Sequence, residues 1–258
     1  MSADYLKYWS LTHRPFLEQS FFQGSPQREA IAGIAFFAAS DCQYANLAGP
    51  PRCGTSVLLQ HVASMHGLCD CAVDMLTSDA KGIRSESDLP IYLATALNLP
   101  LDSTLNDSRD QLQKNLHCGI RTIWLIDRTT PATANLLQSW SHECPELSIV
   151  VACQNLCVVS TTDHQRIDLN PLELDDALQY VQRGILHAAG DPGIFSDAAT
   201  VRLHELCHGR IADMAVLAEQ ALADAATAGH RFVNALLIDA VAKRCTKTAR
   251  TAKTAAAA

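Results

Sequence analysis

The feature that most constrains the fold of this chain is the stretch from Tyr44 to Gln60, YANLAGPPRCGTSVLLQ. A short apolar run is followed by a loop rich in glycine and proline and then by residues with helical apolar periodicity, which indicates a strand, a loop and a helix. The phosphate-binding loop pattern is G-x-x-x-x-G-K-[ST], and Gly49, Gly54 and Ser56 keep its spacing. Thr55 replaces the lysine, so the loop offers a backbone cradle without the cation that reaches the β- and γ-phosphates.

The runs on either side of this loop predict two domains. Four further apolar runs have strand length and lie at residues 69–76, 122–127, 147–154 and 166–172. Helical patterns separate them, and apolar strands that alternate with helices are typical of a parallel sheet covered on both faces. Beyond residue 172 the pattern is helical only, at 174–189, 196–207, 211–228 and 233–244. We therefore expect a doubly wound α/β domain at residues 28–172 and a small all-helical lid domain at residues 173–245.

The two ends of the chain differ from these domains in composition. Residues 1–27 are rich in aromatic side chains, and we expect this lead-in to pack across the α/β domain because large exposed apolar patches are unusual. Residues 246–258 repeat Thr, Ala and Lys, which predicts a disordered basic tail. Such a tail offers a contact for nucleic acid or an acidic partner, but we expect a solvated end.

Composition narrows the class of protein. Hydrophobic residues make up 48% and charged residues 18% of the 258, which indicates a globular chain with a sizeable core. The net charge is −7, and five of the 20 basic residues lie between Lys243 and Ala258, so the rest of the chain is markedly acidic. An acidic body disfavours a broad nucleic-acid surface. With no leader-like start and no apolar run of membrane-spanning length, we expect a cytoplasmic protein without membrane insertion.

The ten cysteines do not require disulfides. A chain of this length can build a hydrophobic core without them. Cys69, Cys71 and Cys153 lie within apolar, strand-like runs, so we expect reduced and buried thiols there. Cys53 lies inside the phosphate loop near a predicted helix N-terminus, where redox control of nucleotide access is an alternative to a small residue that the loop tolerates.

An aspartate ends the apolar run TIWLID at residues 122–127. Asp127 is therefore placed to hold magnesium through water beside the phosphate loop. A nucleoside triphosphatase of the AAA+ class usually follows this aspartate with a glutamate that polarises the attacking water. The next residue here is Arg128, which cannot accept a proton but can pair with a phosphate or a carboxylate.

The order of these features resembles the AAA+ ATPases of the general secretion pathway protein A (ExeA-like) family and the related ATPases of transposition systems. The resemblance rests on an opening YLKYWSLTHRPF, on FFQGSPQREAI, on VVACQNL and on RIDLNPLELDDALQYVQRGILHAAGDPGIFSDAATVRLHELCHG. It covers about residues 5 to 245, and the order of the parts is more specific than any one motif.

The resemblance implies roles for matching residues. ATP or ADP would lie on the loop residues Gly49, Pro50, Pro51, Arg52, Cys53, Gly54, Thr55, Ser56 and Val57, with magnesium near Ser56 and Asp127. Gln154 matches a residue that senses the γ-phosphate, and Arg166 lies where the family has an arginine that reaches a neighbouring subunit's nucleotide. A homo-oligomer or a protein partner is therefore expected. Three positions depart from the family: Thr55 for lysine, Arg128 for glutamate, and Ala212 where the lid usually carries an arginine.

These departures leave three hypotheses within the AAA+ class. The chain is a nucleotide-binding switch with slow hydrolysis, a pseudo-ATPase scaffold that ignores nucleotide, or an active ATPase in which Arg52 or Arg128 supplies the missing cation. Each lost group aimed at developing charge or at the nucleophile costs ~10²- to 10³-fold in rate. Nucleotide binding is therefore expected to survive better than turnover.

A second motif suggests another class of protein. HELCH fits the H-E-x-x-H zinc pattern, with His204 and His208 as ligands, Glu205 as general base and Glu219 as a possible third ligand. The motif is short, Gly209 follows it at once, and the longer metallopeptidase signature is missing downstream. We keep a zinc metallopeptidase as the alternative and expect no zinc there.

Overall fold

The computed structural model describes residues 4–18, 21–65, 67–69, 71–100, 102–153 and 164–255, the last ten of these as backbone only. The chain forms two compact units, residues 26–170 and residues 1–25 together with 171–258.

The unit of residues 26–170 is built on a parallel five-stranded sheet in the order β2-β3-β4-β1-β5. Its strands are β1 (Tyr44–Ala48), β2 (Ala72–Asp79), β3 (Ile120–Thr129), β4 (Leu147–Cys153) and β5 (Gln165–Asp168). Strands β1 and β4 are buried along their whole length, because each has a neighbour on both sides and helices on both faces.

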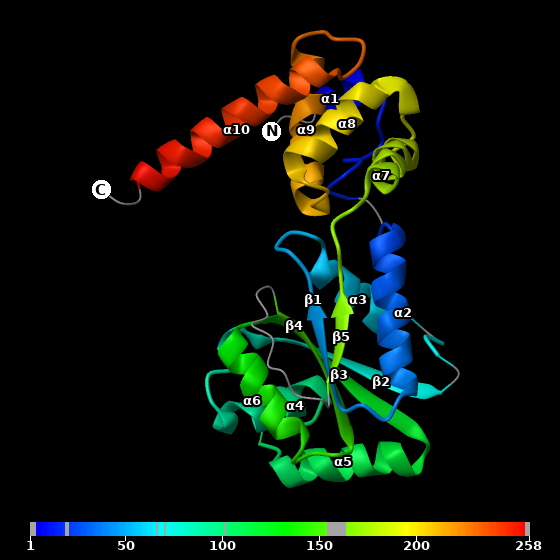
Figure 1. The fold of residues 1–258 in the computed structure, drawn as a ribbon, viewed down its shortest axis with the longest axis vertical. Helices are drawn as coiled ribbons and strands as arrows, with labels where there is room; N and C mark the ends of the chain where they lie inside the picture. Colours follow the sequence, from blue (N-terminus) through cyan, green and yellow to red (C-terminus); the bar gives the residue numbers. More distant parts are fainter. Residues whose placement is uncertain are drawn as a thin grey trace. The chain divides into compact units, whose positions relative to one another are not determined.

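Helices cover both faces of this sheet. Helices α2 (Ser25–Ala39) and α3 (Thr55–Ser64) lie on one face, and α4 (Leu89–Ala96), α5 (Leu105–His117) and α6 (Pro131–Ser141) lie on the other (Figure 1). Side chains of β3 alternate between the two: Trp124 and Ile126 join the core beneath α4, α5 and α6, whereas Leu125 lies near Leu59 of α3. The predicted α/β fold class is confirmed.

Strand β2 begins later than the apolar run predicted. The strand starts at Ala72 and ends at Asp79, so Cys69 and Cys71 precede it, the first half-buried and the second exposed. The expectation that these two thiols are buried in a strand is therefore wrong, whereas Cys153 in β4 is buried. The run also missed the polar end of the strand at residues 77–79, because β2 is an edge strand, whose residues need not be apolar.

The second unit is helical. It contains α1 (Asp4–Tyr8), α7 (Leu174–His187), α8 (Asp197–Cys207), α9 (Ile211–Thr227) and α10 (Ala235–Ala255). Helix α10 reaches Ala255, so residues 246–255, which we expected to be disordered, are helical; alanine and lysine favour this because both have high helix propensity. None of the helices in the described ranges is both long and apolar enough to cross a bilayer.

The aromatic residues of the N-terminal segment belong to the core of this helical unit. The Trp9 indole N–H donates to the Leu222 carbonyl at 3.0 Å, and the Phe16 ring packs edge-on against Phe195. Tyr5 donates its hydroxyl proton to the buried Glu219 carboxylate. Our expectation that the lead-in packs across the α/β domain is wrong for these side chains, because their partners are helices that follow residue 171.

Candidate functional site

The loop between β1 and α3 has the backbone shape that its glycines predict. Gly54 precedes the first residue of α3 with φ 94°, a conformation that glycine adopts without steric cost. The loop turns tightly, since the Cys53 N–H donates to the Pro50 carbonyl at 3.4 Å, and it carries the Cys53 side chain into the interior. Pro51 and Arg52 lie exposed at its tip, and Arg52 has φ 71°. The loop therefore delivers the chain directly to the N-terminus of α3.

Gly49 is required by packing at the first turn of the loop. A Cβ atom at this position would lie 2.8 Å from the Leu169 carbonyl oxygen, because the backbone after β5 passes close beneath it. The Leu169 N–H donates to the Ala48 carbonyl at 2.7 Å and fixes that approach. The spacing of the two glycines thus serves the fold of the loop as well as any ligand.

The N-terminus of α3 is open to an anion. No described side chain caps it, and the first bond from the loop into the helix runs from the Leu58 N–H to the Gly54 carbonyl at 2.9 Å. The N–H groups of Thr55, Ser56 and Val57 precede that bond, where a helix leaves its donors without intrahelical partners. The backbone donors that a phosphate would need are thus present in this part of the loop.

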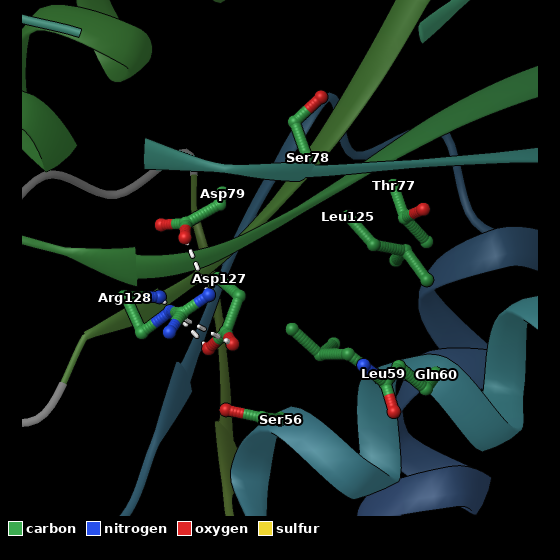
Figure 2. Close-up of a pocket in the computed structure, with 9 residues that line it drawn as sticks. All are labelled: Ser56, Leu59, Gln60, Thr77, Ser78, Asp79, Leu125, Asp127 and Arg128. Carbon is green, nitrogen blue, oxygen red and sulfur yellow. Dashed lines mark hydrogen bonds and ion pairs between the residues drawn. The ribbon is translucent and has the colours of Figure 1, made fainter. Parts of the chain in front are cut away.

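A pocket of about 220 Å³ lies beside this helix end, at the carboxyl ends of β2 and β3 (Figure 2). The described residues that line it are Ser56, Leu59, Gln60, Thr77, Ser78, Asp79, Leu125, Asp127 and Arg128. Ser56 and Asp127, which the sequence predicts as the magnesium pair, are brought to the same pocket. A hydroxyl and a carboxylate are the oxygen ligands that magnesium prefers, so these two donors fit the ion.

Arg128 closes over the carboxylates of this pocket. Its guanidinium forms an ion pair with Asp79, and its Nε lies 3.7 Å from an Asp127 carboxylate oxygen (Figure 2). The Arg128 backbone N–H also donates to Asp127 at 2.8 Å, and Arg128 has φ 54°, in the left-handed region. The cation after the magnesium-side aspartate is therefore engaged by the same carboxylates that would hold the ion.

Sequence reasoning missed Asp79. In the parallel pairing of β2 with β3, Asp79 lies opposite Asp127, so both carboxylates reach the same edge of the sheet. The available signal was a polar residue that ends a strand beside Asp127, and it was concealed because the predicted run stops at residue 76, before the strand ends at Asp79. Asp79, Asp127 and Arg128 give the described lining a net charge of −1. The described lining therefore carries no net positive charge that would attract a triphosphate.

Arg166 and Ala212 belong to other elements of the chain. Gln154 lies outside the described residues. Arg166 is on the edge strand β5, exposed, with its Nε 2.8 Å from Asp168, and strands β4 and β1 separate β5 from β3. Ala212 lies in the first turn of α9. The structure thus brings together Ser56 and Asp127 and leaves Arg166 outside the pocket lining.

The HELCH segment does not form a zinc site. The His204 imidazole Nε2 contacts the Leu172 carbonyl at 2.8 Å, and Glu205 pairs with Arg202 at 2.8 Å. His208 lies beyond the last residue of α8 with φ 52°, which breaks the helical spacing on which the motif depends. Glu219 is occupied in the core by Tyr5, and no cluster of three metal-ligating side chains occurs among the described residues. The zinc metallopeptidase alternative is therefore not supported.

Comparison with known proteins gives the fold of the chain a wider context. The sequence matches no known family model and no curated protein. The structure of Drosophila ORC bound to DNA is similar over 93% of this chain, which spans 65% of that one, with a TM-score of 0.62 and 13% identity. The Aeropyrum pernix ORC2 protein, in ADPNP–ADP complexes, is similar over 90% of this chain and 71% of its own, with a TM-score of 0.62 and 9% identity.

A third solved structure, the Thermotoga maritima RuvB Holliday junction branch migration motor, is similar over 89% of this chain and 72% of its own, with a TM-score of 0.51 and 14% identity. At sequence identities this low, the structural similarity is evidence for the fold but not for the activity. The strand order, the loop between β1 and α3, and these likenesses show that the chain has the fold of the AAA+ P-loop ATPases.

Proposed function

We propose that the chain is an ExeA-like member of the AAA+ ATPases that hydrolyses ATP slowly or not at all. The observation that carries this proposal is the pairing of Arg128 with Asp79 and Asp127. The carboxylate that would hold magnesium is engaged by a cation, and the residue that would polarise the attacking water cannot accept a proton. Arg128 thus removes two requirements for fast phosphoryl transfer: a carboxylate that is free to hold magnesium and a side chain that polarises the attacking water.

The charge of the pocket supports the same proposal. A triphosphate entering a lining of net charge −1 is repelled, and Thr55 contributes no cation to offset this. Losing one charge-assisted hydrogen bond to a phosphate removes about 1.5–3 kcal/mol, which weakens binding by roughly one to two decades. The open N-terminus of α3 still favours an anion, which supports weak binding of ADP or ATP.

Two versions of this proposal differ in their use of nucleotide. In one, ADP or ATP binds weakly and sets the arrangement of subunits or of a protein partner; in the other, the two-unit body is an interaction scaffold that ignores nucleotide. The ADPNP and ADP in the Aeropyrum pernix ORC2 structure support the first version by analogy of fold. The charge of the pocket supports the second.

Arg52 favours a second candidate function, an ATPase with a substitute cation. A residue other than glycine at φ 71° costs about 1–2 kcal/mol relative to a right-handed conformation. Such strain at a loop tip is typical of sites where the side chain serves a ligand. In this version the Arg52 side chain supplies the cation for a phosphate that the α3 N-terminus binds.

Phosphate release by the purified chain, measured with Mg-ATP, tests the proposal. We expect phosphate release by the wild-type chain to be far slower than ordinary AAA+ rates, or undetectable. Hydrolysis at ordinary AAA+ rates that is lost in Asp127→Ala would overturn it, and a further loss in Arg52→Ala but not in Arg166→Ala would establish the substitute cation. Thermal unfolding with millimolar Mg-ATP then separates the two versions, because a ligand that binds only the folded state raises the midpoint. An upward shift selects the switch, and an unchanged midpoint selects the scaffold.

A further inference from the structure

Two cysteines lie together at the end of β2 opposite the pocket. Cys69 and Cys71 precede the first residue of the strand, whereas Asp79 ends it. Their sulfur atoms are 3.2 Å apart, about 1.2 Å more than the bond length of a disulfide. Cys71 is exposed and Cys69 is half-buried, so one thiol of the pair is open to solutes.

A fixed arginine lies beside this pair. The Arg121 guanidinium donates to the Ala38 carbonyl at 3.0 Å and to the Ser148 hydroxyl at 2.7 Å, and it also bonds the carbonyls of Ser40 and Cys42. These contacts tie the carboxyl end of α2 to β3 and β4 and hold the guanidinium in one place. The Cys71 sulfur reaches the same Ala38 carbonyl at 3.9 Å. Cys71 and Arg121 therefore contact the same backbone carbonyl.

The arginine and the thiols interact electrostatically. Burial lowers the pKa of the Arg121 guanidinium, and interactions with Cys71, Asp41, Cys42 and Cys69 oppose that shift. The thiolate is the reactive form of cysteine in exchange with a disulfide, and a neighbouring guanidinium stabilises negative charge on sulfur. The position therefore has a nucleophile, a second thiol in contact with it and a cation.

We propose that Cys69 and Cys71 form a redox-active dithiol that low-molecular-weight disulfides oxidise to an intramolecular disulfide. The exposed Cys71 thiolate attacks one sulfur of the small disulfide, forms a mixed disulfide and releases the first small thiolate. The Cys69 thiolate then attacks the Cys71 sulfur, forms the Cys69–Cys71 bond and releases the second. Two protein thiols are oxidised, one small disulfide is reduced to two small thiols, and the two protons of the protein thiols pass to solvent or to the released thiolates.

A disulfide fits this pair better than a bound metal does. The contact joins two sulfurs, and no cluster of three metal-ligating side chains occurs in the described part of the chain. Cys42 interacts with the same arginine, but in the described contact its backbone carbonyl accepts a hydrogen bond from Arg121 and its thiol takes no part. It is the alternative partner that an experiment must exclude.

Peptide mapping of the full chain in a series of reduced and oxidised glutathione mixtures tests the proposal. After acid quenching and blocking of free thiols with N-ethylmaleimide, trypsin leaves Cys69 and Cys71 in the peptide of residues 53–81 together with Cys53, and leaves Cys42 in the peptide of residues 29–52. We expect the oxidised chain to lose the labels on Cys69 and Cys71 and to keep the label on Cys53.

In the variants Cys69→Ser and Cys71→Ser, the remaining cysteine of the pair should keep its N-ethylmaleimide label after oxidation. Cys245→Ser, which changes another exposed cysteine, is the matched control, and in this variant Cys69 and Cys71 should lose their labels as in the wild-type chain. Retention of both labels in oxidising mixtures would overturn the proposal. A cross-link between the two peptides, which identifies Cys42 as the partner, would overturn it as well, as would a glutathione adduct that persists on Cys71 of the wild-type chain.

Discussion

Replacing Arg128 by glutamine is expected to turn the pocket into a divalent-cation site. The variant keeps much of the side-chain length and leaves the carboxylates of Asp79 and Asp127 without their cation. The exposed fraction of the Arg128 side chain is 48%, so each of its two ion pairs contributes only about 0.2–1 kcal/mol. A metal ion that binds Asp79 and Asp127 in the wild-type chain must break both ion pairs, at a cost of about 0.4–2 kcal/mol. This cost corresponds to roughly 2- to 30-fold in affinity for the metal ion.

Titration with Mn²⁺, followed by the electron paramagnetic resonance of the free ion, measures this change, since carboxylates suit Mn²⁺ as they suit Mg²⁺. We expect Arg128→Gln to bind Mn²⁺ more tightly than the wild-type chain by that factor. Arg166→Gln is the matched control, because Arg166 pairs with Asp168 at a similar exposure, 54%, on β5. Equal affinities of the wild-type chain and Arg128→Gln would refute the argument that this arginine occupies the carboxylates.

Three further changes test the loop and the helical core. Thr55→Lys should tighten Mg-ATP binding roughly 10- to 100-fold by adding a charge-assisted hydrogen bond, as measured by calorimetry, whereas the uncharged Thr55→Gln should leave it unchanged. Gly49→Ala should destabilise the fold by about 1–2 kcal/mol in urea unfolding, because its Cβ would lie 2.8 Å from the Leu169 carbonyl oxygen; an unchanged midpoint would contradict that contact. Burial, and next the hydrogen bond to Glu219, raise the pKa of Tyr5 in the folded chain above its unfolded value. The contribution of neutral Tyr5 to the free energy of unfolding is therefore complete below about pH 10 and is lost as the pH rises further. Tyr5→Phe should therefore flatten the loss of stability on the alkaline side, and an unaltered pH profile would speak against the buried pair.

The sequence was sufficient to predict the central strands of the sheet and the loop. Fully apolar runs identify β1 and β4 because these strands are buried on both faces, and the spacing of Gly49 and Gly54 identifies the turn into α3. Ser56 and Asp127 were also found, since each follows from its place at the end of an element. These features depend on neighbours close in sequence.

The rest depends on strand pairing between distant segments or on a local bend that the apolar pattern does not show. Asp79 joins the pocket only because β2 lies beside β3 in a register that sets it opposite Asp127, and no local pattern encodes that register. The same pairing determines that Arg128 meets two carboxylates. The proximity of Cys69 to Cys71 depends on the bend before β2, which a run of apolar residues does not reveal.

The contacts of the N-terminal segment have a consequence for synthesis of the chain. Tyr5 and its partner Glu219 are 214 residues apart, and the whole unit of residues 26–170 is made between them. At about 5–20 residues per second the ribosome needs roughly 10 to 40 s to cover that distance. During this interval the aromatic residues of the first 25 positions have left the ribosome before the helices that bury them exist. The segment is thus a candidate binding site for chaperones on the nascent chain, and the helical unit can close only after α9 has emerged.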